Sequence, residues 1–458
     1  MLRVRPKRYN LTVYLAFIIC ISLVVSLFLA RVITGSDVTK MSVGQVILTS
    51  QDYELGEVFD RNGKLIVKGN GDEVVWSSDD AKTAFQDIMG IDIAETLGSR
   101  TTVLGNCHWV FGTQDNRFTW DHLIHPGAKK TGGSVMLTLD SDLQEYVSDL
   151  ISDSGYENAY VLVSNYKTGE MLAIYGNVFS DTLHPGSALK PILAAAALSL
   201  NPGLADYTYD CTPDNHSFKT EDGSLTVNCA NGASHGTMNM KNALAYSCNG
   251  YFVSLMHQMD KEAILTVLNQ WGWDTTVSYN QFMYWDHSFV KGSKSDTHYL
   301  LAAIGQANAY ITPAGLSFCT NTLLNHGQLV EPVWFTEKKA SPGSDWQSII
   351  ERADPKAVCS SEAADRVVSM MNAVTEYGTG RSFYLADFAA KTGTAQKSEI
   401  NGNLSGLYTV WTTGGLTSEE TPYSITVCID NVTGDVESAD AGQIAKKILL
   451  YLLGGDQI

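Results

Sequence analysis

The chain has 458 residues, of which 44% are hydrophobic, and its formal net charge is -18. This length is enough for two or three domains, and the apolar content is ordinary for a protein with a large core. The strong negative charge argues against nucleic acid or an anionic membrane surface as the main partner.

The N-terminus carries the features of a membrane anchor. Residues 9–30 carry no charge, and the only charged residues before position 35 are Arg3, Arg5, Lys7, Arg8 and Arg31. An uncharged run of about 22 residues can span a bilayer as a helix, whereas a cleaved signal peptide has a shorter apolar stretch. We therefore expect a cytoplasmic tail (1–8), a single-pass anchor in the cell membrane (9–33) and an extracytoplasmic remainder. A cleaved signal peptide is the alternative.

Two further regions follow. Residues 34–134 mix turn signals with short alternating runs and one helix candidate (80–89), which predicts a small N-terminal domain. Residues 135–458 form a larger domain that begins with a helix (142–151) and a β-hairpin (159–164 and 170–175). Further helices are expected at 187–200, 242–259, 261–270, 361–375 and 441–453, and strands at 407–412 and 423–429. This order favours an α+β fold in which helices flank an antiparallel sheet.

The cysteines allow a disulfide but do not indicate a metal site. Cys211 and Cys229 flank a turn-rich stretch and could be bridged in an extracytoplasmic protein. No Cys-x-x-Cys or His-rich cluster has the spacing of a zinc site, so we expect neither a metal nor a cofactor. The other interpretation is that most of these thiols are small buried hydrophobes.

A serine and a lysine lie one helical turn apart, at Ser187 and Lys190. Pro191 is tolerated only in the first turn of a helix, so the helix must begin at about Ser187. Residues at i and i+3 share a face, and a neutral Lys190 amine could therefore act as the base for a Ser187 nucleophile. The helix N-terminus would stabilise an oxyanion. An ordinary capped helix with a lysine on its flank is the alternative.

Two more strings supply the remaining groups for acyl transfer. Ser247 and Asn249 follow a helical run, where the hydroxyl could relay a proton and the amide could hold a peptide group. The other string consists of Lys391, Thr392, Gly393 and Thr394. Its small residues suit a strand that a substrate backbone approaches closely, and its cation and hydroxyls could bind a carboxylate. The alternatives are a polar helix end and an edge strand with a solvated lysine.

Both strings also occur at places where we expect no chemistry. Ser278, Tyr279 and Asn280 repeat the serine–asparagine pattern in a segment predicted to be a loop. The run 167–169 repeats the lysine–threonine–glycine pattern in the turn of the predicted hairpin, where such residues are structural.

In this order, the three strings resemble the transpeptidases of the penicillin-binding protein family, specifically the membrane-anchored class B type. The similarity extends over most of the chain, at 59–63, 137–144, 168–173, 184–187, 235–236, 247–252, 304–306, 312–313 and 378–380. The resemblance implies a penicillin-binding transpeptidase domain, which is also the fold of serine β-lactamases, with a small N-terminal pedestal and a transmembrane anchor.

The resemblance also implies a role for each residue. Ser187 would be acylated by the D-alanyl-D-alanine end of a peptidoglycan stem peptide, with Lys190 as base, and β-lactam antibiotics would trap it. Ser247 and Asn249 would relay protons and position the substrate. The run 391–394 would bind the terminal carboxylate, and the backbone N–H groups of Ser187 and Thr394 would form the oxyanion hole. A polytopic glycan polymerase is the implied protein partner.

Three rival functions share these motifs. A β-lactamase needs a group that activates water, and the nearest Glu-x-x-Leu string, at Glu262, lies in a predicted helix and is followed by Thr266 rather than asparagine. A D,D-carboxypeptidase would pass the acyl group to water. A catalytically silent scaffold of the same fold is the third alternative, although every nominated side chain is present.

Overall fold

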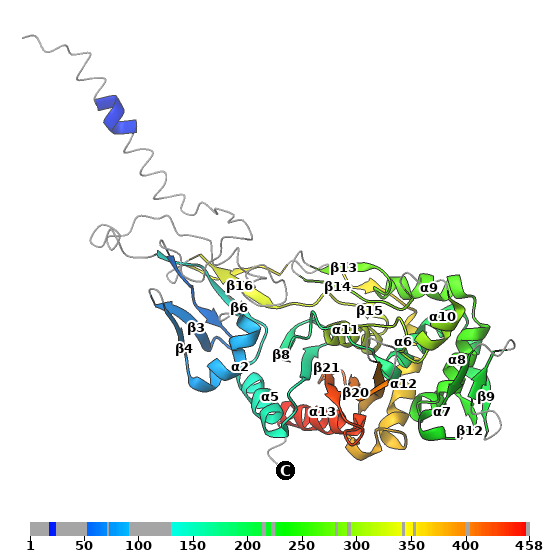
Figure 1. Cartoon of the computed structure of the whole chain (residues 1–458). Coiled ribbons are helices and arrows are strands. Elements are labelled where there is room, and N and C mark those ends of the chain that lie inside the picture. The colour runs from blue at the N-terminus through cyan, green and yellow to red at the C-terminus, as the bar shows by residue number, and fades with distance from the viewer. Residues whose placement is uncertain are drawn as a thin grey trace, which may run out of the picture.

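The computed structural model describes eleven stretches of the chain (Figure 1): 18–23, 53–70, 73–90, 130–212, 217–220, 225–279, 283–290, 295–340, 344–350, 354–398 and 404–454. Within these stretches, no helix has both the length and the apolar character needed to cross a bilayer. The expected cytoplasmic tail lies outside the described residues, and so does the expected anchor apart from a short helical stretch at 18–23.

The centre of the molecule is a five-stranded sheet in which every neighbouring pair is antiparallel. Alternating side chains point to opposite faces, so that Val161 and Val163 join one apolar cluster and Leu162 joins the other. The strands, in spatial order, are β19 (Phe388–Ser398), β20 (Leu404–Leu416), β21 (Tyr423–Val432), β7 (Ala159–Asn165) and β8 (Met171–Tyr175). The antiparallel sheet predicted from the sequence is confirmed.

Helices cover both faces of this sheet (Figure 1). One face packs against α5 (Ser141–Ser154) and α13 (Ser438–Leu452). The other carries α6 (Lys190–Leu200), α11 (Pro313–Leu324) and α12 (Ser361–Glu376). Helix α6 is almost wholly apolar and buried on all sides, which makes it a rigid support for whatever its first turn presents.

A second sheet joins the N-terminal region to the rest of the chain. Its strand order is β17-β16-β6-β2-β3-β4, so β6 (Ser134–Leu137) pairs with both β2 and β16. The expected boundary between residues 134 and 135 therefore falls inside a strand. The other members are β2 (Val58–Phe59), β3 (Leu65–Asn70), β4 (Glu73–Trp76), β16 (Phe335–Lys339) and β17 (Gln347–Ser348). Helix α2 (Asp79–Met89), close to the predicted range, packs on α5.

A third group of elements lies at the right-hand end of the molecule in Figure 1, and its helices α7 and α9 pack against α6. Its helices are α7 (Met240–Ala245), α8 (Asn249–Gln258), α9 (Lys261–Gln270) and α10 (Asp296–Ala302). Its short strands are β9 (Thr208–Cys211), β10 (Ser217–Lys219), β11 (Thr226–Asn228) and β12 (Gly236–Asn239).

The prediction of one helix over 242–259 was wrong. Helix α7 ends at Ala245 and α8 begins at Asn249, because Ser247 between them adopts the left-handed conformation with φ 57°. A non-glycine residue rarely takes this conformation, and it cannot continue a right-handed helix.

The two repeated strings lie away from this break. Residues 167–169 form the turn between β7 and β8, with Gly169 at φ 75°, as predicted. The segment at Ser278 was predicted to be a loop, but it lies in β13 (Thr276–Tyr279), which pairs with β14 (Met283–Asp286).

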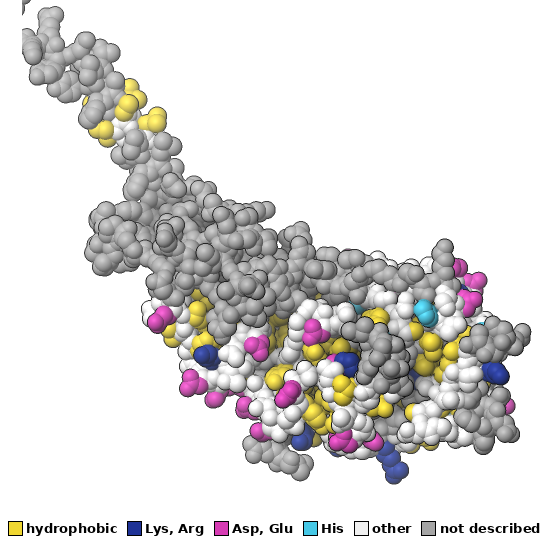
Figure 2. Space-filling model, in the orientation of Figure 1, with side chains coloured by type: hydrophobic (Ala, Val, Ile, Leu, Met, Phe, Trp, Pro, Cys, Tyr) yellow, Lys and Arg dark blue, Asp and Glu magenta, His cyan; other side chains and the backbone are white. Residues whose placement is uncertain are grey.

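On the face shown in Figure 2, the excess negative charge is dispersed rather than gathered in one patch. Acidic side chains on this face are scattered among neutral ones, and the few basic side chains lie apart from one another. Some of these charges pair at the surface, as Lys261 does with Asp296 at 2.8 Å. Such exposed pairs contribute only about 0–1 kcal/mol each to stability, so the cores hold the fold together.

Candidate active site

Ser187 lies in a short 3₁₀ turn, η1 (Gly186–Leu189), that runs directly into α6. The backbone N–H of Lys190 donates to the Ser187 carbonyl, which joins the turn to the helix. Pro191 occupies the first turn of α6, as the sequence argument required. The start of the helical segment therefore agrees with the prediction, except that its first turn is 3₁₀ rather than α.

The η1 turn is held by close backbone contacts with two other segments. Gly186 has φ 53°, and a Cβ atom there would lie 2.5 Å from the Thr394 carbonyl oxygen of β19. The N–H of Gly186 donates to the Gly305 carbonyl at 3.1 Å, and a Cβ on Gly305 would lie 2.1 Å from the Gly186 carbonyl oxygen. Only glycine permits both approaches, and together they fix Ser187 beside β19.

Lys190 is fully buried and hydrogen-bonds to the turn between α7 and α8. Its Nζ donates to the Ser247 carbonyl at 2.7 Å and to Asn249 Oδ1 at 2.7 Å, and lies 3.3 Å from Ser247 Oγ. The left-handed conformation of Ser247 brings its carbonyl and hydroxyl to the same amine. The break between the two helices is therefore what positions these polar groups.

Lys391 reaches the same serine from the opposite side. Its Nζ donates to Ser247 Oγ at 3.1 Å and to the Thr392 carbonyl at 2.7 Å, and the side chain is fully buried. The Thr392 hydroxyl lies 2.5 Å from that of Thr379. Ser247 Oγ thus lies between two lysine amines, one from α6 and one from β19.

Burial shifts both lysines toward the neutral amine. Loss of hydration lowers the pKa of Lys190 from 10.5 to about 8, and the thiols of Cys248 and Cys229 oppose this shift. Burial also lowers the pKa of Lys391 well below 10.5, and the charge of Lys190 lowers it further. Because the Lys190 charge disfavours the charge on Lys391, the protonation of the two amines is linked.

These groups meet in one pocket of about 200 Å³. Its walls include Ser187, Ser247, Asn249 and the run 392–394, while the buried Lys190 and Lys391 reach it through Ser247. The structure therefore brings together the side chains that sequence analysis selected from three distant stretches. It also adds residues to which no role had been assigned: Ala230, His235, Tyr246, Ile304, Gln306, Thr379 and Ser438.

Thr379 is one of the additions that had a signal in the sequence. Thr379 lies between two glycines, and a Cβ on Gly378 would lie 2.2 Å from the Ala245 carbonyl oxygen at the end of α7. The Thr379 N–H donates to that same carbonyl at 3.0 Å. A glycine–threonine–glycine string in which the backbone must approach a helix end marks a site of close packing.

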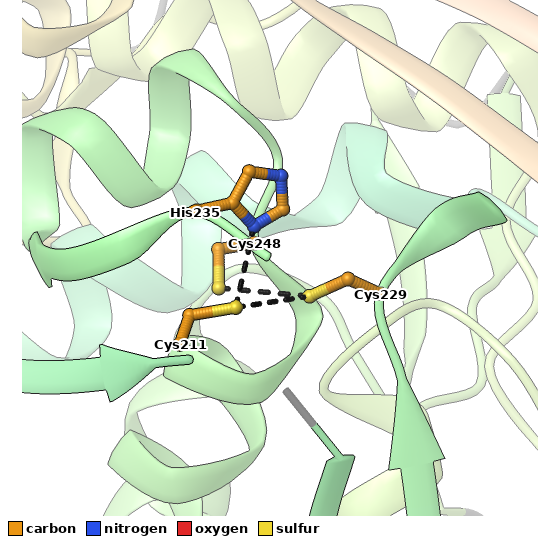
Figure 3. A group of neighbouring side chains, drawn as sticks. All are labelled: Cys211, Cys229, His235 and Cys248. Atoms are coloured by element: carbon orange, nitrogen blue, oxygen red, sulfur yellow. Dashed lines mark hydrogen bonds between the residues drawn. The ribbon is translucent and has the colours of Figure 1, made fainter. Parts of the chain in front are cut away.

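The cysteine expectations need correction. Cys211 and Cys229 are free thiols with their sulfurs 3.8 Å apart, so the suggested disulfide is not formed. Cys248 lies 3.7 Å from Cys229, and His235 Nδ1 lies 3.4 Å from Cys211 (Figure 3). The four ligand atoms form a group that could hold a metal ion, although the sequence spacing did not indicate one.

The fold and the clustered serine and lysine side chains define a class of serine acyl-transferase domain. Residues 159–450 match the family model described as penicillin binding protein transpeptidase domain, which is well over half of the chain. The chain belongs to this family, and the resemblance inferred from its motifs is confirmed.

Curated relatives share low but significant identity with the chain. It is 26% identical over 291 residues to the peptidoglycan D,D-transpeptidase MrdA of Acinetobacter baumannii, covering 58% of this chain and 42% of that protein. For MrdA of Haemophilus influenzae the identity is 24% over 383 residues, covering 70% and 56%. Stage V sporulation protein D of Bacillus subtilis is 23% identical over 348 residues, covering 67% and 51%. The chain thus spans about half the length of these relatives.

Solved structures share the fold. The penicillin-binding protein PBPA of Mycobacterium tuberculosis superposes with a TM-score of 0.73 at 17% identity, covering 89% of this chain and 100% of that one. Penicillin binding protein 3 of the same organism gives a TM-score of 0.69 at 21% identity, covering 88% and 96%. These likenesses confirm the transpeptidase fold with its helix-flanked sheet.

Proposed function

We propose that this protein is a peptidoglycan D,D-transpeptidase that crosslinks stem peptides through an acyl-enzyme on Ser187. The observation that carries the proposal is the placement of Ser247 Oγ within 3.3 Å of two buried lysine amines, in a pocket that Ser187 also lines. Family membership and the names of the relatives support this activity.

Lys190 is suited to act as the base. As a neutral amine it has two N–H groups, which can donate to the Ser247 carbonyl and to Asn249 Oδ1, each at 2.7 Å. Its lone pair then remains available to accept a hydroxyl proton. Ser187 Oγ then attacks the carbonyl carbon of the penultimate D-alanine. An ester forms, the peptide C–N bond breaks, and the serine proton passes through Lys190 and Ser247 to the departing D-alanine amine.

The second half-reaction reverses these proton movements. An amine of a neighbouring stem peptide attacks the ester carbonyl, a new peptide bond forms, and Ser187 Oγ leaves with a proton from the attacking amine. The backbone N–H groups of Ser187 and Thr394 are proposed to hold the oxyanion in both steps. Ser247 and Asn249 connect the base to the leaving and entering amines.

Strand β19 is suited to bind the donor peptide. It is the outermost strand of the five-stranded sheet, so an extended peptide can pair with its free edge. The cationic form of Lys391 and the hydroxyls of Thr392 and Thr394 would receive the terminal carboxylate of the stem peptide. β-Lactams would enter the same site in place of the donor peptide and acylate Ser187.

Product analysis tests the activity. We would incubate the full chain with a stem-peptide donor and an amine acceptor and identify the products by mass spectrometry. A crosslinked product that is absent with Ser187→Ala supports the proposal. Release of D-alanine with water as the only acceptor would indicate a D,D-carboxypeptidase, and no turnover would indicate a silent scaffold.

We further propose the membrane topology and partners expected from the sequence. The uncharged run over 9–30 and the preceding cations support a single anchor with the pocket outside the cell. Residues 34–134 would serve as a pedestal that sets the height of the pocket and contacts a polytopic glycan polymerase. Extraction of cell membranes with alkaline carbonate tests the anchor, because release of the chain into the soluble fraction would contradict it.

A further inference from the structure

Three cysteines and a histidine converge directly beside the pocket. Cys211 ends β9, Cys229 follows β11, His235 precedes β12, and Cys248 is the N-cap residue of α8. Figure 3 shows the three sulfur atoms and Nδ1 of His235 pointing toward one another. All four ligand atoms lie within 4.8 Å of each other, although their residues come from four separate segments.

Three of the six separations between these ligand atoms match those of ligands around one tetrahedral zinc ion. Zn–S bonds of about 2.3 Å at tetrahedral angles place two sulfurs about 3.8 Å apart, and a Zn–N bond of about 2.0 Å places sulfur and nitrogen about 3.5 Å apart. The structure has 3.8 Å for Cys211–Cys229, 3.7 Å for Cys229–Cys248 and 3.4 Å for Cys211 Sγ to His235 Nδ1.

The surroundings also fit a metal rather than a disulfide. The three thiols are almost fully buried and His235 is half-buried, so bulk water has little access to the sulfurs. Cys229 lies equally close to two other cysteines, whereas a disulfide would use only one of them and leave the other thiol and the imidazole aside.

We propose that Cys211, Cys229, His235 and Cys248 bind one Zn²⁺ in a closed tetrahedral site. Four protein ligands leave no position for water or substrate, so the ion is structural rather than catalytic. Soft sulfur ligands and one imidazole in this geometry select zinc over the hard cations magnesium and calcium. Binding displaces the thiol protons to solvent, so affinity rises with pH.

The proposed metal site adjoins the turn that positions Lys190 in the pocket. Cys248 lies between Ser247 and Asn249, which hold Lys190 through hydrogen bonds of 2.7 Å. A metal at Cys248 would tie this turn to the paired strands β9 and β12 and to the end of β11. The ion would therefore help to hold Ser247 in its left-handed conformation, which costs free energy for a residue other than glycine.

Metal analysis of the full chain tests the proposal without relying on activity. We expect about one zinc ion per chain in protein purified without chelators or metal-affinity resin. Exchange with Co²⁺ should give thiolate-to-cobalt charge-transfer bands and the strong visible bands of tetrahedral cobalt. Reduced protein that takes up neither ion would overturn the proposal, and so would a Cys211–Cys229 disulfide or the weak spectrum of octahedral cobalt.

Matched variants locate the site. Cys229→Ser and His235→Ala each remove a proposed ligand. Loss of a group that only hydrogen-bonds to a ligand weakens metal binding by roughly 10- to 100-fold, so each of these variants should weaken it by more. His235 is half-buried, so its variant should fold even if the cysteine variant does not. Cys359→Ser is the control, because this buried cysteine lies outside the cluster. Equal zinc content in all three variants would contradict the assignment.

A second readout connects the ion to the pocket and rests on the proposed function. Removal of zinc should slow penicillin acylation, and adding zinc back should restore it. If the protein binds zinc but does not react with penicillin, the metal site stands and the proposed function fails.

Discussion

At the residue scale, the proposed acylation of Ser187 depends on the protonation of Lys190. Burial lowers its pKa from 10.5 to about 8, so the fraction of neutral amine increases as the pH rises through that value. The groups that face it are the Lys391 amine across Ser247 Oγ and the thiols of Cys229 and Cys248. If the neutral amine is the base, the acylation rate constant for a penicillin should increase with pH and level off above about pH 8.

Replacing the lysine tests this directly. Lys190→Met should lower the acylation rate constant by about 10²- to 10⁴-fold and abolish its rise with pH. Lys167→Met is the matched control, because Lys167 lies in the repeated string at the hairpin turn and is partly exposed. Stopped-flow or gel-based labelling from about pH 6 to about pH 10 gives the profile. A pH-independent rate in the unmodified protein would exclude Lys190 as the base.

At the element scale, the pocket depends on how closely η1 approaches β19. Gly186→Ala should destabilise the fold by about 1–2 kcal/mol for its left-handed backbone and by about 1–3 kcal/mol more for the clash with Thr394. Gly155→Ala carries the same backbone cost, with φ 74°, but its Cβ would have no neighbour within 4 Å. Urea unfolding of the two variants isolates the contact. Equal losses of unfolding free energy would mean that the approach is not tight.

The elements that could be predicted are those with a local signal. The hairpin of β7 and β8 and the limits of α9 follow from short-range patterns of apolar and turn residues. The helical run before Ser247 could be recognised, but the left-handed conformation of Ser247 between α7 and α8 has no such signal.

Two features that join residues far apart in the sequence could not be predicted, for the same physical reason. The pairing of β6 with β16 joins segments about 200 residues apart, and nothing in either segment specifies its partner. The cysteine–histidine group combines four segments at spacings that match no short zinc motif, so only the fold reveals it. By contrast, Ser187, Lys190 and the lysine strand could be proposed together because their strings occur in the order that is typical of the penicillin-binding protein family.

At the scale of the whole molecule, the N-terminal strands and the transpeptidase domain share a sheet and an apolar core. Val58 is fully buried and pairs with Val67 and Val135. Val58→Ala should therefore lower the stability of the entire molecule by about 1–3 kcal/mol, with one cooperative transition. Val75→Ala, at a 37% exposed position on β4, should have little effect. Two independent unfolding transitions in calorimetry would contradict the expectation that the N-terminal strands and the transpeptidase domain unfold together.

The central claim is that Ser187 is the nucleophile of a penicillin-reactive pocket. The most direct measurement is to incubate the full chain with a fluorescent penicillin and to map the modified peptide by mass spectrometry. Ser199→Ala is the matched control, because Ser199 lies on α6 and its hydroxyl is bonded to the Ala195 carbonyl. The account predicts a long-lived adduct on Ser187 that Ser187→Ala eliminates and Ser199→Ala leaves intact. An adduct on another residue, rapid turnover of the penicillin, or no adduct at all would contradict it.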